Sequence, residues 1–249
     1  MCGRYTLTLK FSEIEDELGL KDSPAHPASS HGEWKGRYNI APTQVLPVVI
    51  QKDGHRALEW MRWGLVPFWA KDPSIGNKMI NARGETVAEK PAFKNAFRKR
   101  RCLIPTDGFY EWKKTGKVKT PIWIRPEKTK VFCLAGLWEN WNSPSGEVLE
   151  TFTILTTSAN PFMKKIHDRM PLILSHRDEK LWLDPGTSEE KLLELIHPYS
   201  EKTLIAHAVS RAVNTPSNDH PECIQSVASE ERDDDEGDDE EDSQLSLIS

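Results

Sequence analysis

One stretch of the chain indicates the fold most directly: Asp107-Gly108-Phe109-Tyr110-Glu111-Trp112-Lys113. Its side chains alternate in character and include three aromatic rings, which is typical of a β-strand with one face in a core. The apolar segment 102–105 precedes it, and segments 120–125 and 131–139 continue the pattern across short turns. We therefore expect a run of neighbouring strands joined by tight turns in this part of the chain.

Further strands are expected on both sides of this run. Segments 45–50 and 57–61 flank the polar turn Lys52-Asp53-Gly54 and predict a hairpin. Other strands are expected at 150–157, 172–174 and 204–209, and short helices at 91–101, 160–166, 177–183 and 188–196. Because helices and strands do not alternate regularly, the pattern predicts an α+β fold. We expect a single domain with a curled, mostly antiparallel sheet flanked by short helices.

The first helix and the basic run at 98–101 carry more specific expectations. Ser12 is a candidate N-cap with Glu15 three residues later, Ile14 supplies the apolar face, and Gly19 ends the helix. The run Arg98-Lys99-Arg100-Arg101 is expected to be the solvated C-terminal end of a helix, where cations are favoured.

Charge divides the chain of 249 residues into two parts. Residues 229–249 contain eleven acidic residues and one arginine, which leaves 32 basic and 27 acidic residues elsewhere, a net charge of +5. A segment made almost wholly of Asp and Glu cannot bury enough apolar surface to fold. We expect a domain at 2–215 and a disordered acidic tail at 216–249, and a basic body is compatible with a polyanionic partner.

The cysteines and the apolar runs indicate in which cellular compartment the protein is expected. Four cysteines without a CxxC pair fit a reduced cytosolic or nuclear protein better than a disulfide scaffold or a zinc site. No apolar run is long enough to span a bilayer, and the first twenty residues lack a secretory pattern. Histidines show no ligand spacing, so we expect no metal and no cofactor. Cys102 and Cys133 are expected to be buried, inert thiols.

The chain starts with Met1-Cys2, and small residues at position 2 favour removal of the initiator Met. Cys2 would then carry a free amine and a thiol, with unperturbed pKa values of about 8 and about 8.5. Such an aminothiol can condense with an aldehyde to an imine and close to a five-membered thiazolidine. The plain alternative is that position 2 is only the frayed start of the chain.

Six segments, taken in order along the chain, give this start its context. They are Met1-Cys2-Gly3-Arg4-Tyr5, Arg37-Tyr38-Asn39-Ile40-Ala41-Pro42, Arg62-Trp63-Gly64-Leu65-Val66-Pro67, Ile80-Asn81-Ala82-Arg83-Gly84-Glu85-Thr86, Gly108-Phe109-Tyr110-Glu111-Trp112 and Ile166-His167-Asp168-Arg169-Met170-Pro171. From residue 2 to about 215 the chain closely resembles the SOS response-associated peptidase (SRAP) family, which shields abasic sites in single-stranded DNA by covalent crosslinking. The acidic tail departs from the family pattern.

The resemblance implies roles for ten residues. Cys2 would form the crosslink, Asn81 would hold its amine and the opened sugar, Glu111 would act as acid and base, and His167 would transfer protons. The implied DNA-binding residues are Arg4, Arg83 and Arg169 on phosphates, and Pro42, Phe68 and Trp69 where the strand bends and its bases stack.

Residue chemistry supports these roles but leaves alternatives. Imidazole transfers protons in both directions near neutral pH, and burial can raise a carboxyl pKa into the same range. Without the resemblance, Glu111 would be a solvated face residue, Asn81 a turn former and Arg83 a surface charge. Trp63 and Trp112 are expected mainly in the core.

Three functions therefore stay open at the level of sequence. The leading one is capture of abasic sites in single-stranded DNA, or at single-strand/duplex junctions, by a thiazolidine crosslink, with a possible lyase side activity. The second is a cysteine peptidase with Cys2 as nucleophile and His167 as base. The third is a passive single-stranded DNA-binding module. We expect a monomer, associated with the nucleoid in a bacterium or nuclear in a eukaryote.

Overall fold

A computed structural model describes residues 2–20 and 34–227. Most of the expected loop at 22–37 and the acidic run beyond residue 227 lie outside the described residues. Among the helices that the structure describes, none has the length and apolar character needed to cross a membrane.

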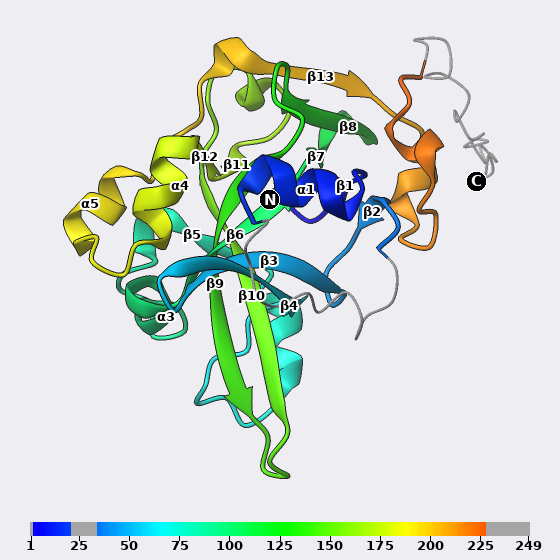
Figure 1. The fold of residues 1–249 in the computed structure, drawn as a ribbon. Helices are drawn as coiled ribbons and strands as arrows, with labels where there is room; N and C mark the ends of the chain where they lie inside the picture. The colour runs from blue at the N-terminus through cyan, green and yellow to red at the C-terminus, as the bar shows by residue number, and fades with distance from the viewer. Residues whose placement is uncertain (1, 21–33, 228–249) are drawn as a thin grey trace, which may run out of the picture.

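The strands form two sheets (Figure 1). The smaller sheet is wholly antiparallel in its pairings. Its strand order is β13 (Leu204–Ala208), β8 (Val118–Pro126), β7 (Gly108–Thr115), β1 (Tyr5–Leu7) and β2 (Arg37–Ile40). The strand predicted at 107–113 is confirmed as β7, which is the central strand of this sheet.

The larger sheet curls until it closes. Its order is β11 (Arg169–Pro171), β10 (Val148–Ser158), β4 (His55–Trp63), β3 (Val45–Lys52), β6 (Arg101–Thr106), β9 (Phe132–Asn142) and β12 (Ile173–Leu174). Because β10 also pairs with β9, the strands β10, β4, β3, β6 and β9 form a closed barrel. A short strand, β5 (Asn81–Arg83), pairs with β10 in parallel, as β4 does. The expected α+β class with a curled, mostly antiparallel sheet is confirmed.

Short helices surround the sheets. Those of α type are α1 (Phe11–Leu18), α3 (Lys94–Lys99), α4 (His176–Leu183) and α5 (Glu189–Glu194). The 3₁₀ turns are η1 (Pro73–Lys78), η2 (Gly84–Thr86), η3 (Met163–Lys165), η4 (Glu201–Thr203), η5 (Arg211–Asn214) and η6 (Pro221–Ile224). In Figure 1, α3, α4 and α5 lie on the left of the barrel, while η5 and η6, in orange, lie on the right beside β2.

The expected start of α1 is wrong by two residues. Its N-cap is Lys10, whose backbone N–H donates to the Glu13 carboxylate at 3.0 Å, so Ser12 lies inside the helix. The apolar face and the end are as expected, since Ile14 is buried and Gly19 adopts a left-handed φ of 67°. A glycine bears that conformation without a Cβ penalty.

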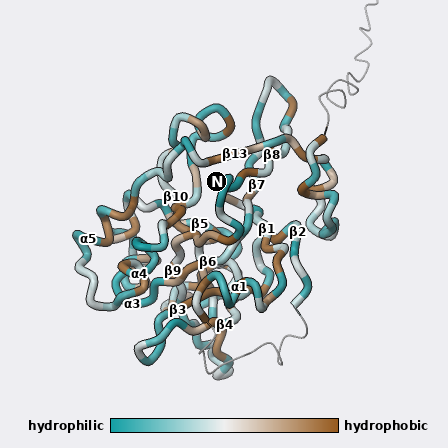
Figure 2. The backbone as a smooth tube through the Cα atoms, turned by 45° about the horizontal axis from the view of Figure 1, so that its top comes forward, coloured by the Kyte–Doolittle hydropathy of each residue, from teal (hydrophilic) through white to brown (hydrophobic). Residues whose placement is uncertain are grey.

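One core joins the two sheets. Figure 2 shows apolar residues concentrated along the strands and polar residues along the connecting loops. Trp63 is fully buried, with its ring 5.3 Å from Tyr5 and 6.2 Å from Phe152 between centroids, which confirms its core assignment. Cys102 and Cys133 are also fully buried, and burial raises the pKa of both thiols. Both thiols are therefore unreactive, as expected, because a raised pKa leaves little of the nucleophilic thiolate form.

The basic run at 98–101 is only partly a solvated helix end. Arg98 is exposed and pairs with Glu189 at 2.7 Å. Arg101 is only 6% exposed and donates to four backbone carbonyls, those of Phe97, Arg98, Trp182 and Asp184. Its guanidinium therefore ties the ends of α3 and α4 together, because a buried cation needs all its donors satisfied.

The folded chain continues past residue 215, where the sequence suggested that the domain ends. Asp219 accepts hydrogen bonds from the backbone of Tyr38 and Asn39 and pairs with Arg37. Cys223 is buried, and its carbonyl accepts from the Tyr110 hydroxyl at 3.2 Å. Residues 216–227 are thus packed against β2 and β7 as part of the domain.

Candidate functional site

The pairing of β1 with β7 brings the start of the chain to the predicted site. Tyr5 lies opposite Phe109, and the backbone N–H of Tyr110 donates to the Arg4 carbonyl at 3.0 Å. Antiparallel pairing in this register carries residues 2–4 alongside Glu111. Buried Asp107 fastens the same pair of segments, since its carboxylate accepts from the Thr8 backbone N–H at 2.7 Å.

Cys2 is completely buried and is held through its backbone. The Asn81 side-chain amide donates from Nδ2 to the Cys2 carbonyl at 2.9 Å, and the Cys2 Sγ contacts the Arg4 carbonyl at 3.9 Å. Asn81 is carried by β5, which runs parallel to β10 with Asn81 opposite Ile154. Its Oδ1 is buried and accepts no hydrogen bond among the described residues. An amide can donate and accept at once, so one half of this side chain stays ready for a donor.

Burial raises the pKa values of Cys2 and of the carboxyl group beside it. Glu111 is only 2% exposed, and desolvation raises the pKa of its carboxyl although the charge of His167 opposes that rise. Desolvation also raises the pKa of the Cys2 thiol above its usual range, and the charge of Glu111 adds to the effect. Both groups therefore hold their protons more tightly than in water. The alternative of Glu111 as a solvated face residue is excluded by its burial.

His167 follows η3 and is fixed by the turn after it. The Arg169 backbone N–H donates to His167 Nδ1 at 3.0 Å, and the Asp168 carboxylate lies 2.9 Å from the same nitrogen. The two contacts require opposite roles of Nδ1. The Asp168 side chain is 86% exposed, so water competes for its carboxylate, and the backbone contact is the better shielded of the two.

Glu111 and His167 line one hollow of about 580 Å³. The other residues of its wall are Trp112, Lys114, Lys119 and Asn214. Trp112 is half-buried, and its indole N–H donates to the Asn214 Oδ1 at 2.8 Å. Trp112 also packs against the buried cluster of Tyr110, Val209 and Val213, so it belongs to that small core, as expected, and to the wall of the hollow.

The four predicted catalytic residues therefore form one connected group. Asn81 is bonded to Cys2, the charge of Glu111 acts on the Cys2 thiol, and Glu111 shares both a hollow and an electrostatic interaction with His167. Cys2 does not itself line the hollow, since it lies beneath the surface.

The predicted phosphate-binding arginines differ in their surroundings. Arg4 is partly buried, and its guanidinium donates to Asn39 Oδ1 at 2.6 Å, to the Val213 carbonyl at 2.6 Å and to the Asn214 carbonyl at 3.2 Å. These bonds join the segment after Cys2 to the wall of the hollow. Arg4 thus holds the site together, whatever it contributes to phosphate binding.

Arg169 and Arg83 lie near each other in the fold but are engaged differently. Arg169 makes two bonds to the Glu85 carboxylate, at 2.5 and 2.9 Å, and a third to the Thr156 carbonyl. The hydrogen bond from Arg169 lowers the pKa of Glu85. Arg83 is exposed and has no ion-pair partner among the residues described. Arg83 is therefore the most available of the three arginines for a phosphate group.

The predicted stacking residues lie on the surface. Phe68 is 53% exposed and Trp69 is 49% exposed, which is unusual for rings of this size outside binding surfaces. Pro42 is half-buried and precedes Thr43, whose φ of 74° marks a sharp turn of the backbone. The three residues belong to the two loops on either side of the β3–β4 hairpin. The first of these loops is bonded to the end of β4, since the Thr43 backbone N–H donates to the Trp63 carbonyl.

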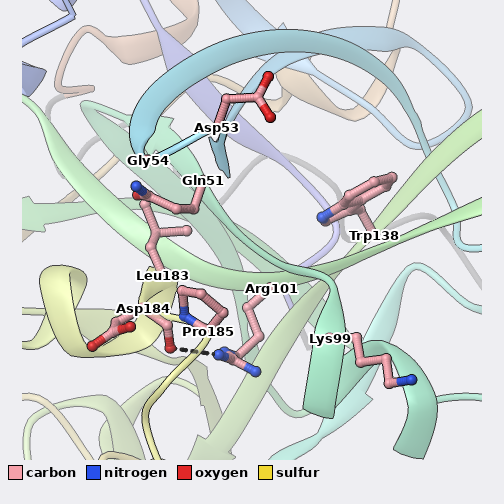
Figure 3. Close-up of a pocket in the computed structure, with 9 residues that line it drawn as sticks. All are labelled: Gln51, Asp53, Gly54, Lys99, Arg101, Trp138, Leu183, Asp184 and Pro185. Carbon is pink, nitrogen blue, oxygen red and sulfur yellow. Dashed lines mark hydrogen bonds between the residues drawn. The ribbon is translucent and has the colours of Figure 1, made fainter.

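A second hollow, of about 400 Å³, lies elsewhere and contains none of the predicted site residues (Figure 3). It is lined by Gln51, Asp53, Gly54, Lys99, Arg101, Trp138, Leu183, Asp184 and Pro185. Its central cation, Arg101, is committed to backbone carbonyls, and Figure 3 shows one of these bonds, to Asp184. Within residues 2–20 and 34–227, no group of three or more His, Cys, Asp or Glu is arranged to hold a metal ion.

Sequence reasoning missed three residues of the hollow's wall. Lys114 and Lys119 stand in a visibly basic segment, Lys113-Lys114-Thr115-Gly116-Lys117-Val118-Lys119, and that clustering could have singled them out. Asn214 carries no local signal, because only the packing of η5 against β7 brings it to the site.

Known proteins resemble this chain along most of its length. The family model described as SOS response associated peptidase (SRAP) matches residues 1–216. The chain belongs to the SRAP family. It is 44% identical over 228 residues to the abasic site processing protein YoqW of Bacillus subtilis, covering 91% of this chain and 100% of that protein. It is 33% identical over 265 residues to the abasic site processing protein HMCES of Xenopus tropicalis, covering 91% of this chain and 78% of that protein.

A solved structure gives the same result for the fold. A protein from Bacteroides thetaiotaomicron superposes with a TM-score of 0.81 at 26% sequence identity, covering 91% of this chain and all of that one. The resemblance to the SRAP family drawn from the six motifs is therefore confirmed over the domain.

Proposed function

We propose that this protein captures abasic sites in single-stranded DNA by forming a thiazolidine crosslink through Cys2 after Met1 is removed. The observation that carries the proposal is the connected group around Cys2. The Asn81 side-chain amide donates to the Cys2 carbonyl at 2.9 Å. The buried carboxyl of Glu111 has a raised pKa, and its charge contributes to the raised pKa of the Cys2 thiol. Relatives that are named abasic site processing proteins cover nine-tenths of the chain, which supports the substrate.

The chemistry consists of two additions and one loss of water. The Cys2 amine attacks the aldehyde carbon of the ring-opened abasic sugar and forms a C–N bond, giving a carbinolamine. Loss of the carbinolamine hydroxyl as water leaves an imine. The Cys2 sulfur then adds to the imine carbon, its proton passes to the nitrogen, and the five-membered ring is closed.

Each step requires a proton transfer that the residues of the site can supply. Glu111, whose carboxyl holds a proton more tightly than usual, donates it to the departing hydroxyl and accepts one from the amine. His167 exchanges protons with solvent through the hollow that both residues line. The free acceptor of Asn81, Oδ1, orients the amine or a sugar hydroxyl.

The amine adds first because the ring closes by addition of the sulfur to the imine carbon. With Met1 in place, burial raises the pKa of the Cys2 thiol and disfavours the thiolate. A cysteine peptidase needs the opposite arrangement, a thiolate activated by a neighbouring base. The raised pKa of Cys2 therefore favours the crosslinking function over the peptidase alternative.

Intact mass spectrometry of the protein with an abasic oligonucleotide tests the proposal. We expect a 1:1 adduct whose mass is the sum of both components, without Met1, less one water. An imine has the same mass, but borohydride adds two hydrogens to an imine and none to a thiazolidine. A stable adduct that borohydride does not change supports the proposal. Absence of an adduct, with equal affinity for intact and abasic strands, would leave a passive DNA-binding module.

A further inference from the structure

The β7–β8 hairpin carries a group of cations that the proposed crosslinking chemistry does not use. We propose that this basic hairpin, residues 113–119, binds the phosphates that flank an abasic sugar seated in the hollow. Its lysines are Lys113, Lys114, Lys117 and Lys119, and all are exposed. The inference rests on the proposed function for the identity of the strand, and on the geometry below for the place of contact.

Two of the lysines stand directly at the site. Lys114 and Lys119 line the same hollow as Glu111 and His167, and they lie opposite each other across the β7–β8 pair. Lys114 follows Trp112 by two residues and lies opposite Lys119, so Trp112, Lys114 and Lys119 share one face of the ribbon. Two positive charges therefore stand side by side at the hollow, and Lys113 and Lys117 add further charge to the hairpin.

The ammonium groups of Lys114 and Lys119 do not stabilise the hairpin itself. Among the described residues, Lys114 and Lys119 form no ion pair with a carboxylate, although lysines at 52 and 191 do. Like charges placed directly opposite in a sheet repel each other and weaken the pairing. A polyanion lying across both ammonium groups removes that repulsion, whereas water and salt only screen it.

The position of the hollow identifies the polyanion. Every sugar of a nucleic acid strand lies between two phosphates, so a sugar that reaches Glu111 brings a phosphate to the rim of the hollow. Lysine is suited to this contact because its ammonium is a flexible point charge that does not depend on base identity. The basic hairpin would thus contact the strand separately from Phe68 and Trp69, which are exposed on a different loop.

The salt dependence of binding measures such contacts directly. Each phosphate that a protein neutralises on a single strand adds about 0.7 to the steepness with which log K falls as log salt rises. Loss of two contacts should therefore reduce the slope by about 1.4, which corresponds to roughly tenfold weaker binding at physiological salt. The test is fluorescence anisotropy of the full chain with a single-stranded oligonucleotide that contains a tetrahydrofuran residue, which has no aldehyde and cannot crosslink.

The variants are chosen to separate the effect of the position of the lysines from the effect of the net charge of the protein. We expect K114Q/K119Q to lose about 1.4 from the slope, K114R/K119R to keep it, and K128Q/K130Q to keep it as well. Lys128 and Lys130 are exposed lysines beyond the far end of β8, so this control changes the net charge equally. All these side chains are solvent-exposed, and circular dichroism verifies that each variant is folded.

Three results would overturn the inference. An equal loss of slope in both glutamine pairs would mean that only net charge acts. An unchanged slope in K114Q/K119Q would mean that the hairpin does not contact the strand. Tighter binding in that variant would mean that the lysines hold the acidic tail of the chain instead. Crosslinking of a natural abasic oligonucleotide, measured separately, shows whether the function proposed for Cys2 stands when this inference fails.

Discussion

Replacing Glu111 with glutamine should make the protein more stable, and only above acidic pH. Burial raises the pKa of Glu111 in the folded state, so the folded protein binds its proton more tightly than the unfolded chain does. The stability that comes from the neutral carboxyl is complete below the unfolded pKa, about 4.3, and is lost as the pH rises through the raised folded pKa. Glutamine stays neutral at every pH and keeps that stability.

The size of the gain follows from linkage. Each unit by which folding raises the pKa of Glu111 is about 1.4 kcal/mol of stability that the variant retains at pH 8. For a chain of this length, 1 kcal/mol shifts the melting temperature by about 2–4 °C, so each unit gives about 3–5 °C. Differential scanning fluorimetry of E111Q and the unmodified protein from pH 4 to pH 8 measures the difference directly. The curves should coincide at pH 4 and separate steadily as the pH rises.

Glu179 provides the matched control. It is also buried, at 1% exposure, but its carboxylate is 3.3 Å from the Arg56 guanidinium. E179Q leaves the partly buried Arg56 guanidinium with a weaker partner, so it should destabilise the protein at pH 8. If E111Q were destabilised at pH 8, or shifted equally at every pH, Glu111 would be a stabilising structural carboxylate and the proton-holding role proposed for it would be wrong.

Four further variants test the other groups of the site. Asn81→Ala removes the hydrogen bond to the Cys2 carbonyl, so crosslinking should slow by at least tenfold in a time course on denaturing gels, while stability falls by about 1 kcal/mol in a urea titration. Phe68→Ala and Trp69→Ala should each weaken binding to single strands by about 1–3 kcal/mol in anisotropy, and leave the melting temperature unchanged because both rings are half exposed. Arg83→Gln should lower the salt slope by about 0.7, and an unchanged slope would remove Arg83 from the phosphate path.

The local pattern of the sequence predicted the strands well because alternation is set by neighbours along the chain. Residues 108–113 of the predicted strand lie in β7, at the centre of its sheet, and the polar turn at 52–54 joins β3 and β4. Closure of the barrel was not visible, because the pairing of β10 with β4 joins strands that are far apart in sequence and run parallel.

The site could be found in sequence only through its motifs. Alternation alone would expose Glu111, and it is buried because residues 2–4 lie alongside β7, a contact between distant segments. Arg101 looked like part of a solvated run, and only the carbonyls at the ends of two helices explain its burial. The wall residue Asn214 depends on the packing of η5, which no pattern in residues 211–214 predicts.

The central claim is that amine and thiol of Cys2 act together, and a single gel experiment tests it. Three proteins are compared on an abasic single-stranded oligonucleotide: one that begins at Cys2, one with a short extension retained ahead of Cys2, and Cys2→Ser. Only the first should give an adduct that survives heating in detergent, while Cys2→Ser should give one only when borohydride traps the imine. An equally stable adduct from the extended protein would contradict the claim, because its Cys2 has no free amine.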